Sequence, residues 1–223
     1  MNMANNKRQC TDAGFTLVEV LVSLAIISIL LAALTGVFER SGRLYTSQNA
    51  TAALQQEVRA ALDVIASEVR MAAYNPTKAD NSSTNQKFSI KKASATEFRF
   101  TTDLDGDGKL GNPTTKKPYN DDGECEVRSF WLSLGTQSIR MGCGYGTPYV
   151  KDWQPLIGDT DNLKVTVLDF SYLDKDNNPT TLMSEIRSTV ITITAEAPAG
   201  RAGMLQRTYT TTVDIRNAGL NDA

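Results

Sequence analysis

The sequence predicts an α+β fold in which one long N-terminal helix packs against an antiparallel β-sheet. The first proline is Pro76, so no proline breaks a helix before that point. Beyond residue 86 the chain changes to short segments in which apolar and polar residues alternate, a period typical of strands. A helix with one apolar face, followed by such strands, buries that face against the sheet that the strands form.

The segment 15–38 is apolar except for one ionisable residue, Glu19. Its 24 residues would form a helix of roughly 36 Å, which is long enough to cross the hydrocarbon core of a bilayer. A carboxylate in such a span costs on the order of 2.5–3.5 kcal/mol and is usually kept for a function. We therefore expect a transmembrane helix over 15–38 and a functional role for Glu19.

The helical pattern continues past Phe38 to about Ala73, and this second half is amphipathic. Its apolar residues recur at steps of three and four, which places them on one helix face that a sheet must cover. The stripe consists of Leu54, Val58, Ala61, Leu62, Ile65, Val69 and Ala72. Residues 75–86 then have the composition of a loop.

Strands are expected in the remainder of the chain, where β-branched and aromatic residues alternate with polar ones. The segments are 88–90, 96–100, 127–134, 138–141, 163–172, 187–194 and 208–215. Gly135-Thr136 predicts a tight turn that pairs the segment ending at Leu134 with the one starting at Gln137. A polar insertion occupies 103–123.

The composition argues against catalysis and against nucleic acid as a partner. Histidine is absent, which removes the Ser-His-Asp triad, histidine-ligated zinc and the commonest general base. No nucleophile elbow, phosphate loop or dinucleotide fingerprint occurs. The formal net charge is −2, with no run of Lys or Arg on an expected face. A membrane-tethered enzyme is therefore the weakest alternative.

The N-terminus carries a specific motif: basic Lys7 and Arg8, then Gly14, then Phe15-Thr16-Leu17-Val18-Glu19 opening an apolar helix. It resembles the processing site of type IV prepilins and of type II secretion pseudopilins. The resemblance implies that a membrane-embedded aspartyl prepilin peptidase cuts between Gly14 and Phe15 and methylates the new amino terminus. It also implies that Glu19 neutralises the terminal amine of a neighbouring subunit during assembly.

A second resemblance lies in LQQEVRAALDVIASEVRMAAYNP, residues 54–76. It is similar to the helix end of W-type minor pilins of type IV pili, and less closely to J-type minor pseudopilins of type II secretion. The implied protein is a minor pilin that helps to initiate or cap the filament, with other pilins and the peptidase as partners. A pilus-tip adhesin is a further alternative, with a cleft around Trp131, Tyr145, Tyr149 and Trp153.

These inferences give one organisation for the chain. Residues 1–14 are a leader that is removed, 15–38 the transmembrane and assembly half of the helix, 39–74 its amphipathic half, and 75–223 a β-rich pilin domain. The chain would be a single-pass protein of the inner membrane with a periplasmic C-terminal domain, and later part of a pilus at the cell surface. A secretory signal peptide fits poorly, since Glu19 interrupts its core. An unprocessed signal anchor stays open, because basic residues flank both ends of the span equally.

Two cysteines remain after the leader with Cys10 is removed, Cys125 and Cys143, and an even number outside the cytoplasm favours a disulfide. Counting outward from the Gly135-Thr136 turn places Cys125 opposite Gly146 instead of Cys143. Either the turn is longer than expected, or the bridge joins segments that flank the strands.

The insertion begins with carboxylates at alternate positions, Asp103, Asp105 and Asp107, and has glycine at the sixth position and Leu110 at the eighth. This pattern resembles the first half of an EF-hand loop and predicts a calcium site that includes Lys109. The twelfth position is Thr114, so closure would come from later acidic residues: Asp121, Asp122 or Glu124. A solvated acidic turn is the alternative. Magnesium fits less well, because it demands a tight octahedron.

Overall fold

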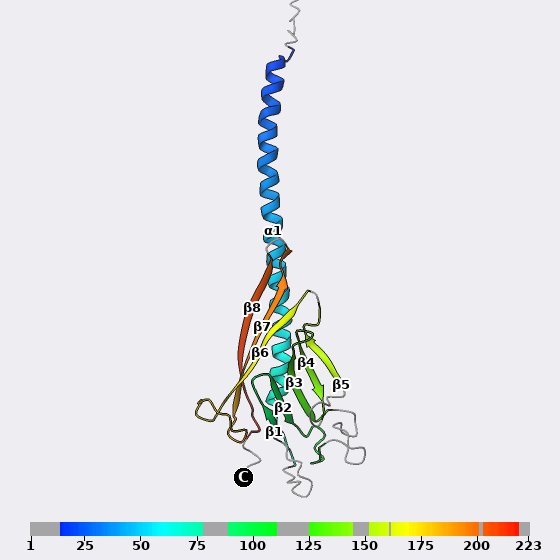
Figure 1. Cartoon of the computed structure of the whole chain (residues 1–223), viewed down its shortest axis with the longest axis vertical. Helices are drawn as coiled ribbons and strands as arrows, with labels where there is room; N and C mark the ends of the chain where they lie inside the picture. Colours follow the sequence, from blue (N-terminus) through cyan, green and yellow to red (C-terminus); the bar gives the residue numbers. More distant parts are fainter. Residues whose placement is uncertain are drawn as a thin grey trace, which may run out of the picture. The chain divides into compact units, whose positions relative to one another are not determined.

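The computed structural model describes residues 14–77, 89–110, 125–144, 152–160, 162–200 and 203–218. The chain divides into two compact units, Met1–Tyr45 and Thr46–Ala223. One helix, α1 (Leu17–Arg70), contributes residues to both units (Figure 1). Its bounds agree with the expected continuous helix to within three residues at either end.

The helix ends because the chain turns sharply after Arg70. Ala73 adopts a positive φ of 61°, a conformation that stops helical propagation, and Pro76 follows. The backbone N–H of Ala73 donates instead to the carbonyl of Thr101, and that of Asp103 donates to Tyr74, at 2.9 Å in each case. The end of α1 is thereby joined to the segment that carries the acidic loop.

The predicted apolar stripe of α1 is confirmed. Every member of it is buried, with Val58, Ile65 and Val69 fully inaccessible, and Ala66 joins the same buried face. The intervening charged residues remain at the surface, apart from half-buried Glu68. The stripe forms one cluster with side chains from both sheets of the second unit.

The first sheet has five antiparallel strands in the order of the sequence. They are β1 (Ile90–Ala93), β2 (Glu97–Thr101), β3 (Val127–Ser133), β4 (Ser138–Cys143) and β5 (Asp152–Ile157). Ser133 pairs with Ser138, so the predicted turn and its register are both present. Strand β5 was not expected, because Pro155 interrupts its pattern; it lies at the sheet edge, where proline is tolerated.

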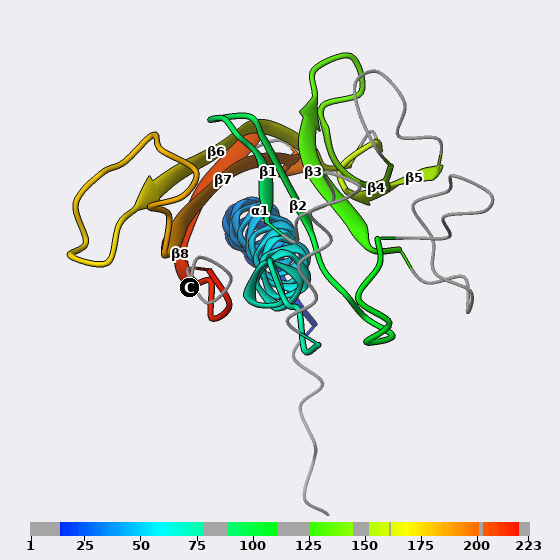
Figure 2. The same cartoon turned by 90° about the horizontal axis from the view of Figure 1, so that it is seen from below.

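The second sheet has three antiparallel strands, β6 (Lys164–Leu173), β7 (Ser188–Pro198) and β8 (Met204–Asp214). The expectation of one sheet is therefore corrected to two, because β6 pairs with β7 and not with β5. Two backbone hydrogen bonds connect β6 to turns of the first sheet: Phe170 N–H to Ala95 O and Val165 N–H to Gln137 O, at 2.8 and 2.7 Å. Within this unit the strands of both sheets are arranged around the helix (Figure 2).

Aromatic residues fill the region where the two sheets and the helix meet. Phe98 is fully buried, and its ring lies 5.5 Å from that of Phe100, 5.8 Å from Phe170 and 5.6 Å from Tyr172. The Tyr172 hydroxyl donates to the carbonyl of Ser94 at 2.8 Å, and burial raises the pKa of this phenol well above its usual range. These rings join β2 of one sheet to β6 of the other.

Removal of the Phe98 ring should therefore destabilise the second unit strongly. We expect Phe98→Ala to lower the free energy of unfolding by about 3–5 kcal/mol, because the fully buried site cannot collapse around the lost volume. Chemical denaturation of the full chain in detergent micelles measures this loss. Leu134→Ala is the matched control, since Leu134 is 79% exposed and should change stability by less than about 0.5 kcal/mol. Equal effects of the two substitutions would contradict the packing described here.

Candidate functional site

The expected processing site lies immediately before α1. Gly14, Phe15 and Thr16 have no regular secondary structure, and all three are exposed. Thr16 and Glu19 then start the helix by a reciprocal set of hydrogen bonds. The N–H and the hydroxyl of Thr16 each donate to Glu19 Oε2 at 2.9 Å, and the N–H of Glu19 donates to Thr16 Oγ1 at 3.3 Å. This is a capping box, which sets where the helix begins.

The capping box leaves the Gly14–Phe15 bond in an accessible, non-helical segment. A cleaving enzyme needs such a segment, because a peptide bond within a helix is protected by its hydrogen bonds. No atom lies within 4 Å of a side chain added at Gly14. This chain itself therefore does not require glycine at that position.

The rest of the apolar segment is suited to a non-aqueous environment. All side chains of residues 15–38 are exposed, and the hydroxyls within the helix bond to its own carbonyls. Ser23 donates to Glu19 O and Ser28 to Leu24 O at 2.7 Å, and Thr35 donates to Ala32 O at 2.9 Å. Among the described residues, α1 is long and apolar enough to cross a membrane. Glu19 is the one ionisable group in that apolar stretch.

The acidic loop after β2 gathers three carboxylates. Oxygen atoms of Asp103, Asp105 and Glu126 all lie within 4.8 Å of one another. Asp103 and Glu126 are fully buried, whereas Asp105 is exposed. The N–H groups of Gly106 and Gly108 donate to the Asp103 carboxylate at 2.8 and 3.1 Å, which needs the positive φ of 75° at both glycines.

The electrostatic environment of Asp103 disfavours a bare negative charge. Burial raises the pKa of the Asp103 carboxyl, and the neighbouring charge of Asp105 raises it further. The two backbone hydrogen bonds from Gly106 and Gly108 lower it but do not cancel the effect of burial. Glu126 is held toward the same loop, since its Oε1 accepts the N–H of Leu104 at 3.2 Å.

The structure therefore brings together some of the expected calcium ligands and not others. The carboxylate of Asp107 is bonded to Lys109 instead. The backbone N–H of Lys109 donates to Asp107 Oδ1 at 2.6 Å, and its Nζ donates to Asp107 Oδ2 at 3.2 Å. The other expected ligands, Asp121, Asp122 and Glu124, lie outside the described residues. Glu126 was missed: it lies just beyond the acidic residues considered for closure, and only long-range pairing of β3 with β2 brings it to the loop.

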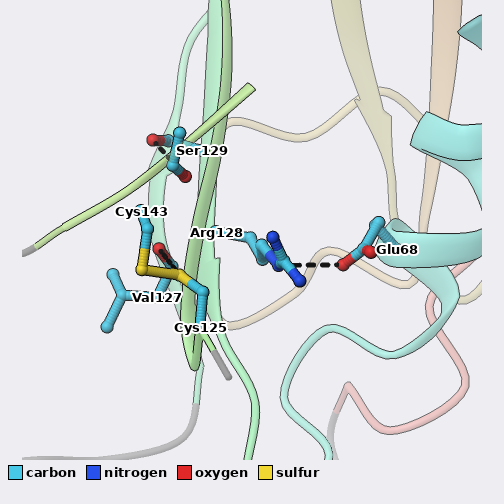
Figure 3. The surroundings of a disulfide bond; sticks show 7 residues. Glu68, Cys125, Val127, Arg128, Ser129 and Cys143 are labelled. Atoms are coloured by element: carbon cyan, nitrogen blue, oxygen red, sulfur yellow. Dashed lines mark hydrogen bonds and ion pairs between the residues drawn. A yellow bond between two sulfur atoms is a disulfide. The ribbon is translucent and has the colours of Figure 1, made fainter. Parts of the chain in front are cut away.

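Cys125 and Cys143 form a disulfide with a Cα–Cα distance of 5.8 Å (Figure 3). The β3–β4 register agrees with the count made from the sequence, since Cys143 is opposite Arg128 and not Cys125. The second of the two expected arrangements is therefore correct for one cysteine: Cys125 lies before β3, whereas Cys143 is the last residue of β4. Both cysteines are buried.

The aromatic cleft expected for an adhesin can be assessed at one residue only. Trp131 is half-buried on β3, opposite Arg140 of β4. Tyr145 and Tyr149 lie outside the described residues, and of Trp153 only the backbone, paired with Gly142, is described.

Comparison with known proteins first identifies the motif at the N-terminus. Residues 11–35 match the prokaryotic N-terminal methylation motif, which places the chain among type IV pilin-like proteins. Residues 47–215 match the family described as prepilin peptidase-dependent protein B, and the chain belongs to that family. No curated protein gives a match. Among solved structures, a type IV-like pilin from Thermus thermophilus is similar at 14% identity and a TM-score of 0.47, over 74% of this chain and 98% of that one.

The family defines the general role of the chain. It is a prepilin peptidase-dependent, pilin-like protein, which is a structural component and not an enzyme. The methylation motif on an apolar helix indicates anchoring in the inner membrane before assembly.

The disulfide should stabilise the second unit measurably. With its cysteines 18 positions apart in the sequence, the bond should contribute about 3 kcal/mol by restricting the unfolded chain. We expect the double variant Cys125→Ser with Cys143→Ser to lose that amount in denaturant unfolding, as reduced wild-type protein should. Cys10→Ser is the control and should unfold like wild type. Two alkylatable thiols at Cys125 and Cys143 in unreduced protein would refute the bridge.

Proposed function

We propose that this chain is a minor pilin of a type IV pilus, of the W type, which enters the filament through its N-terminal helix and helps to initiate or cap assembly. One observation carries the proposal: the carboxylate of Glu19, the one ionisable group in a wholly exposed apolar segment, lies at the first turn of α1 next to Gly14–Phe15. A buried core would explain an apolar helix, but these side chains have no such core around them.

Processing is the first step of the proposed role. The prepilin peptidase would cut the Gly14–Phe15 bond, which is exposed and lies outside the helix, and then methylate Phe15. Residues 1–14 would be lost with the leader. Since a side chain at Gly14 meets no atom of this chain, a requirement for glycine would come from the active site of the peptidase.

Assembly is the second step, and in it Glu19 would change partners. In the unassembled chain its carboxylate accepts both hydrogen bonds from Thr16. Cleavage creates an amine at Phe15, and a neighbouring subunit's Glu19 would neutralise that amine within the packed helices. Such a pair is favourable in an apolar environment because the alternative, an unpaired charge, is costly there.

The globular unit would then lie outside the cytoplasm, in the periplasm and later at the pilus tip. The disulfide supports this placement, because disulfides persist in oxidising compartments. The resemblance of residues 54–76 supports the W type over the J type. A minor pseudopilin of type II secretion is the second candidate, and gene deletion separates the two. Loss of pili with normal secretion supports the pilin role, whereas loss of secretion with normal pili would support the pseudopilin.

Substitution of Gly14 tests processing. We expect Gly14→Val to accumulate an unprocessed form that keeps residues 1–14, because the peptidase would no longer accept the bond. Mass spectrometry of the membrane fraction detects the retained leader. Gly42→Val is the matched control, since Gly42 is equally free of nearby atoms, and it should be processed normally. Normal processing of Gly14→Val would rule out the proposed cleavage site.

Substitution of Glu19 tests assembly separately from folding. We expect Glu19→Ala and Glu19→Gln to enter sheared pili at least about tenfold less than wild type, because neither side chain can neutralise a buried amine. Glutamine still offers an oxygen to Thr16 but carries no charge. The Glu19→Gln variant therefore distinguishes the effect of the charge from that of the helix cap. The melting temperature of the second unit should not change, since among the described residues Glu19 bonds within its own unit, to Thr16 and Ser23. Glu39→Gln is the control for an exposed carboxylate on the same helix. If Glu19→Gln assembles as well as wild type, the carboxylate serves only as a cap.

A further inference from the structure

Two carboxylates are buried side by side where the acidic loop meets β3. Asp103 and Glu126 are both 0% exposed, and with Asp105 their oxygens lie within 4.8 Å of one another. Carboxylates this close repel one another when they are ionised. The three come from two separate segments, so the fold itself holds them together against that repulsion.

A fourth oxygen, from an uncharged side chain, points to a ligand at this position. Thr102 is 1% exposed, and its buried hydroxyl has no hydrogen-bond partner among the described residues. Its backbone N–H donates to Glu126 O at 2.9 Å, which extends the β2–β3 register beyond the Thr101–Val127 pair. Residues opposite each other in an antiparallel pair project from the same face, so the Thr102 and Glu126 side chains share one face of the sheet. A buried hydroxyl without a partner is unfavourable unless something binds it.

We propose that Asp103, Asp105 and Glu126, with the Thr102 hydroxyl, bind a calcium ion. The donors are all oxygen, which hard cations prefer, and the chain has no histidine while both cysteines of the second unit are in the disulfide. Calcium accepts six to eight oxygens in irregular geometry, whereas magnesium demands a near-ideal octahedron. A loop with glycines at two positive-φ positions can supply further carbonyl oxygens in such irregular geometry. This site differs from an EF-hand, because Glu126, immediately before β3, takes the place of Asp107 from the loop.

The ion would join three parts of the second unit. Asp103 is bonded through its backbone to Tyr74 at the end of α1, Asp105 belongs to the loop, and Glu126 immediately precedes β3. Calcium would therefore fasten the loop after β2 to the start of β3, next to the disulfide. The inference is independent of the proposed role in the pilus.

Calcium titration of the full chain in detergent micelles, first stripped with a chelator, tests the site. We expect wild type to bind one calcium ion by calorimetry and to melt at a higher temperature in calcium than in chelator. Glu126→Gln and Asp105→Asn should weaken binding at least about tenfold, since ligand charge sets the affinity of such sites. Asp176→Asn, in an exposed acidic turn, is the matched control and should bind like wild type.

Thr102→Val provides a second test, which distinguishes a calcium ligand from a residue with a purely structural role. Valine has the same shape and lacks the hydroxyl, so in chelator the variant should melt at or above the wild-type temperature. Its gain in melting temperature on adding calcium should be smaller than that of wild type. The proposal is overturned if wild type gives no binding heat and melts identically in calcium and chelator. It is also overturned if magnesium stabilises equally, or if Glu126→Gln retains wild-type affinity.

Discussion

The fold of the second unit depends on the burial of one face of α1. The stripe from Leu54 to Ala72 is covered by side chains of both sheets. Each of its five buried Leu, Val and Ile side chains contributes roughly 1.5–3 kcal/mol, so the stripe supplies much of the driving force for this unit. Among the described residues, two backbone hydrogen bonds of β6 and the hydroxyl of Tyr172 bond the second sheet to turns of the first. The helix and the aromatic cluster around Phe98 add the apolar contacts that hold the sheets together.

The same helix meets a different constraint before residue 39. There its side chains are apolar all round and exposed, and its hydroxyls are satisfied by its own backbone. One helix therefore has two kinds of surface, a one-sided stripe for a folded unit and a continuous apolar surface for lipid or for other helices. The carboxylate of Glu19 is the one ionisable group on this continuous apolar surface. Within the described part of the chain it accepts hydrogen bonds from Thr16, and it could exchange that cap for a stronger, charged partner.

Sequence patterns predicted the features that depend on local periodicity. The stripe on α1 follows the 3.6-residue period, and the β3–β4 register follows from the position of the Gly135-Thr136 turn. What the sequence did not predict depends on contacts between distant segments. The division into two sheets, the edge strand β5 with its proline, and the approach of Glu126 to Asp103 all arise from pairing that no short pattern encodes. Asp107 fits the loop pattern, but its carboxylate accepts a hydrogen bond from Lys109, two positions further along the chain.

The start of β3 shows how the insertion of residues 103–123 can be accommodated. Four consecutive residues there are fastened to four different parts of the unit. Cys125 is bonded to the end of β4, Glu126 accepts from Leu104 of the acidic loop, Val127 pairs with β2, and Arg128 Nε lies 3.2 Å from Glu68 of α1 (Figure 3). An insertion between two paired strands costs loop-closure entropy, which grows only slowly with its length. Covalent and ionic contacts concentrated where the chain re-enters the sheet offset that cost, so the register of β3 does not depend on the structure of the insertion itself.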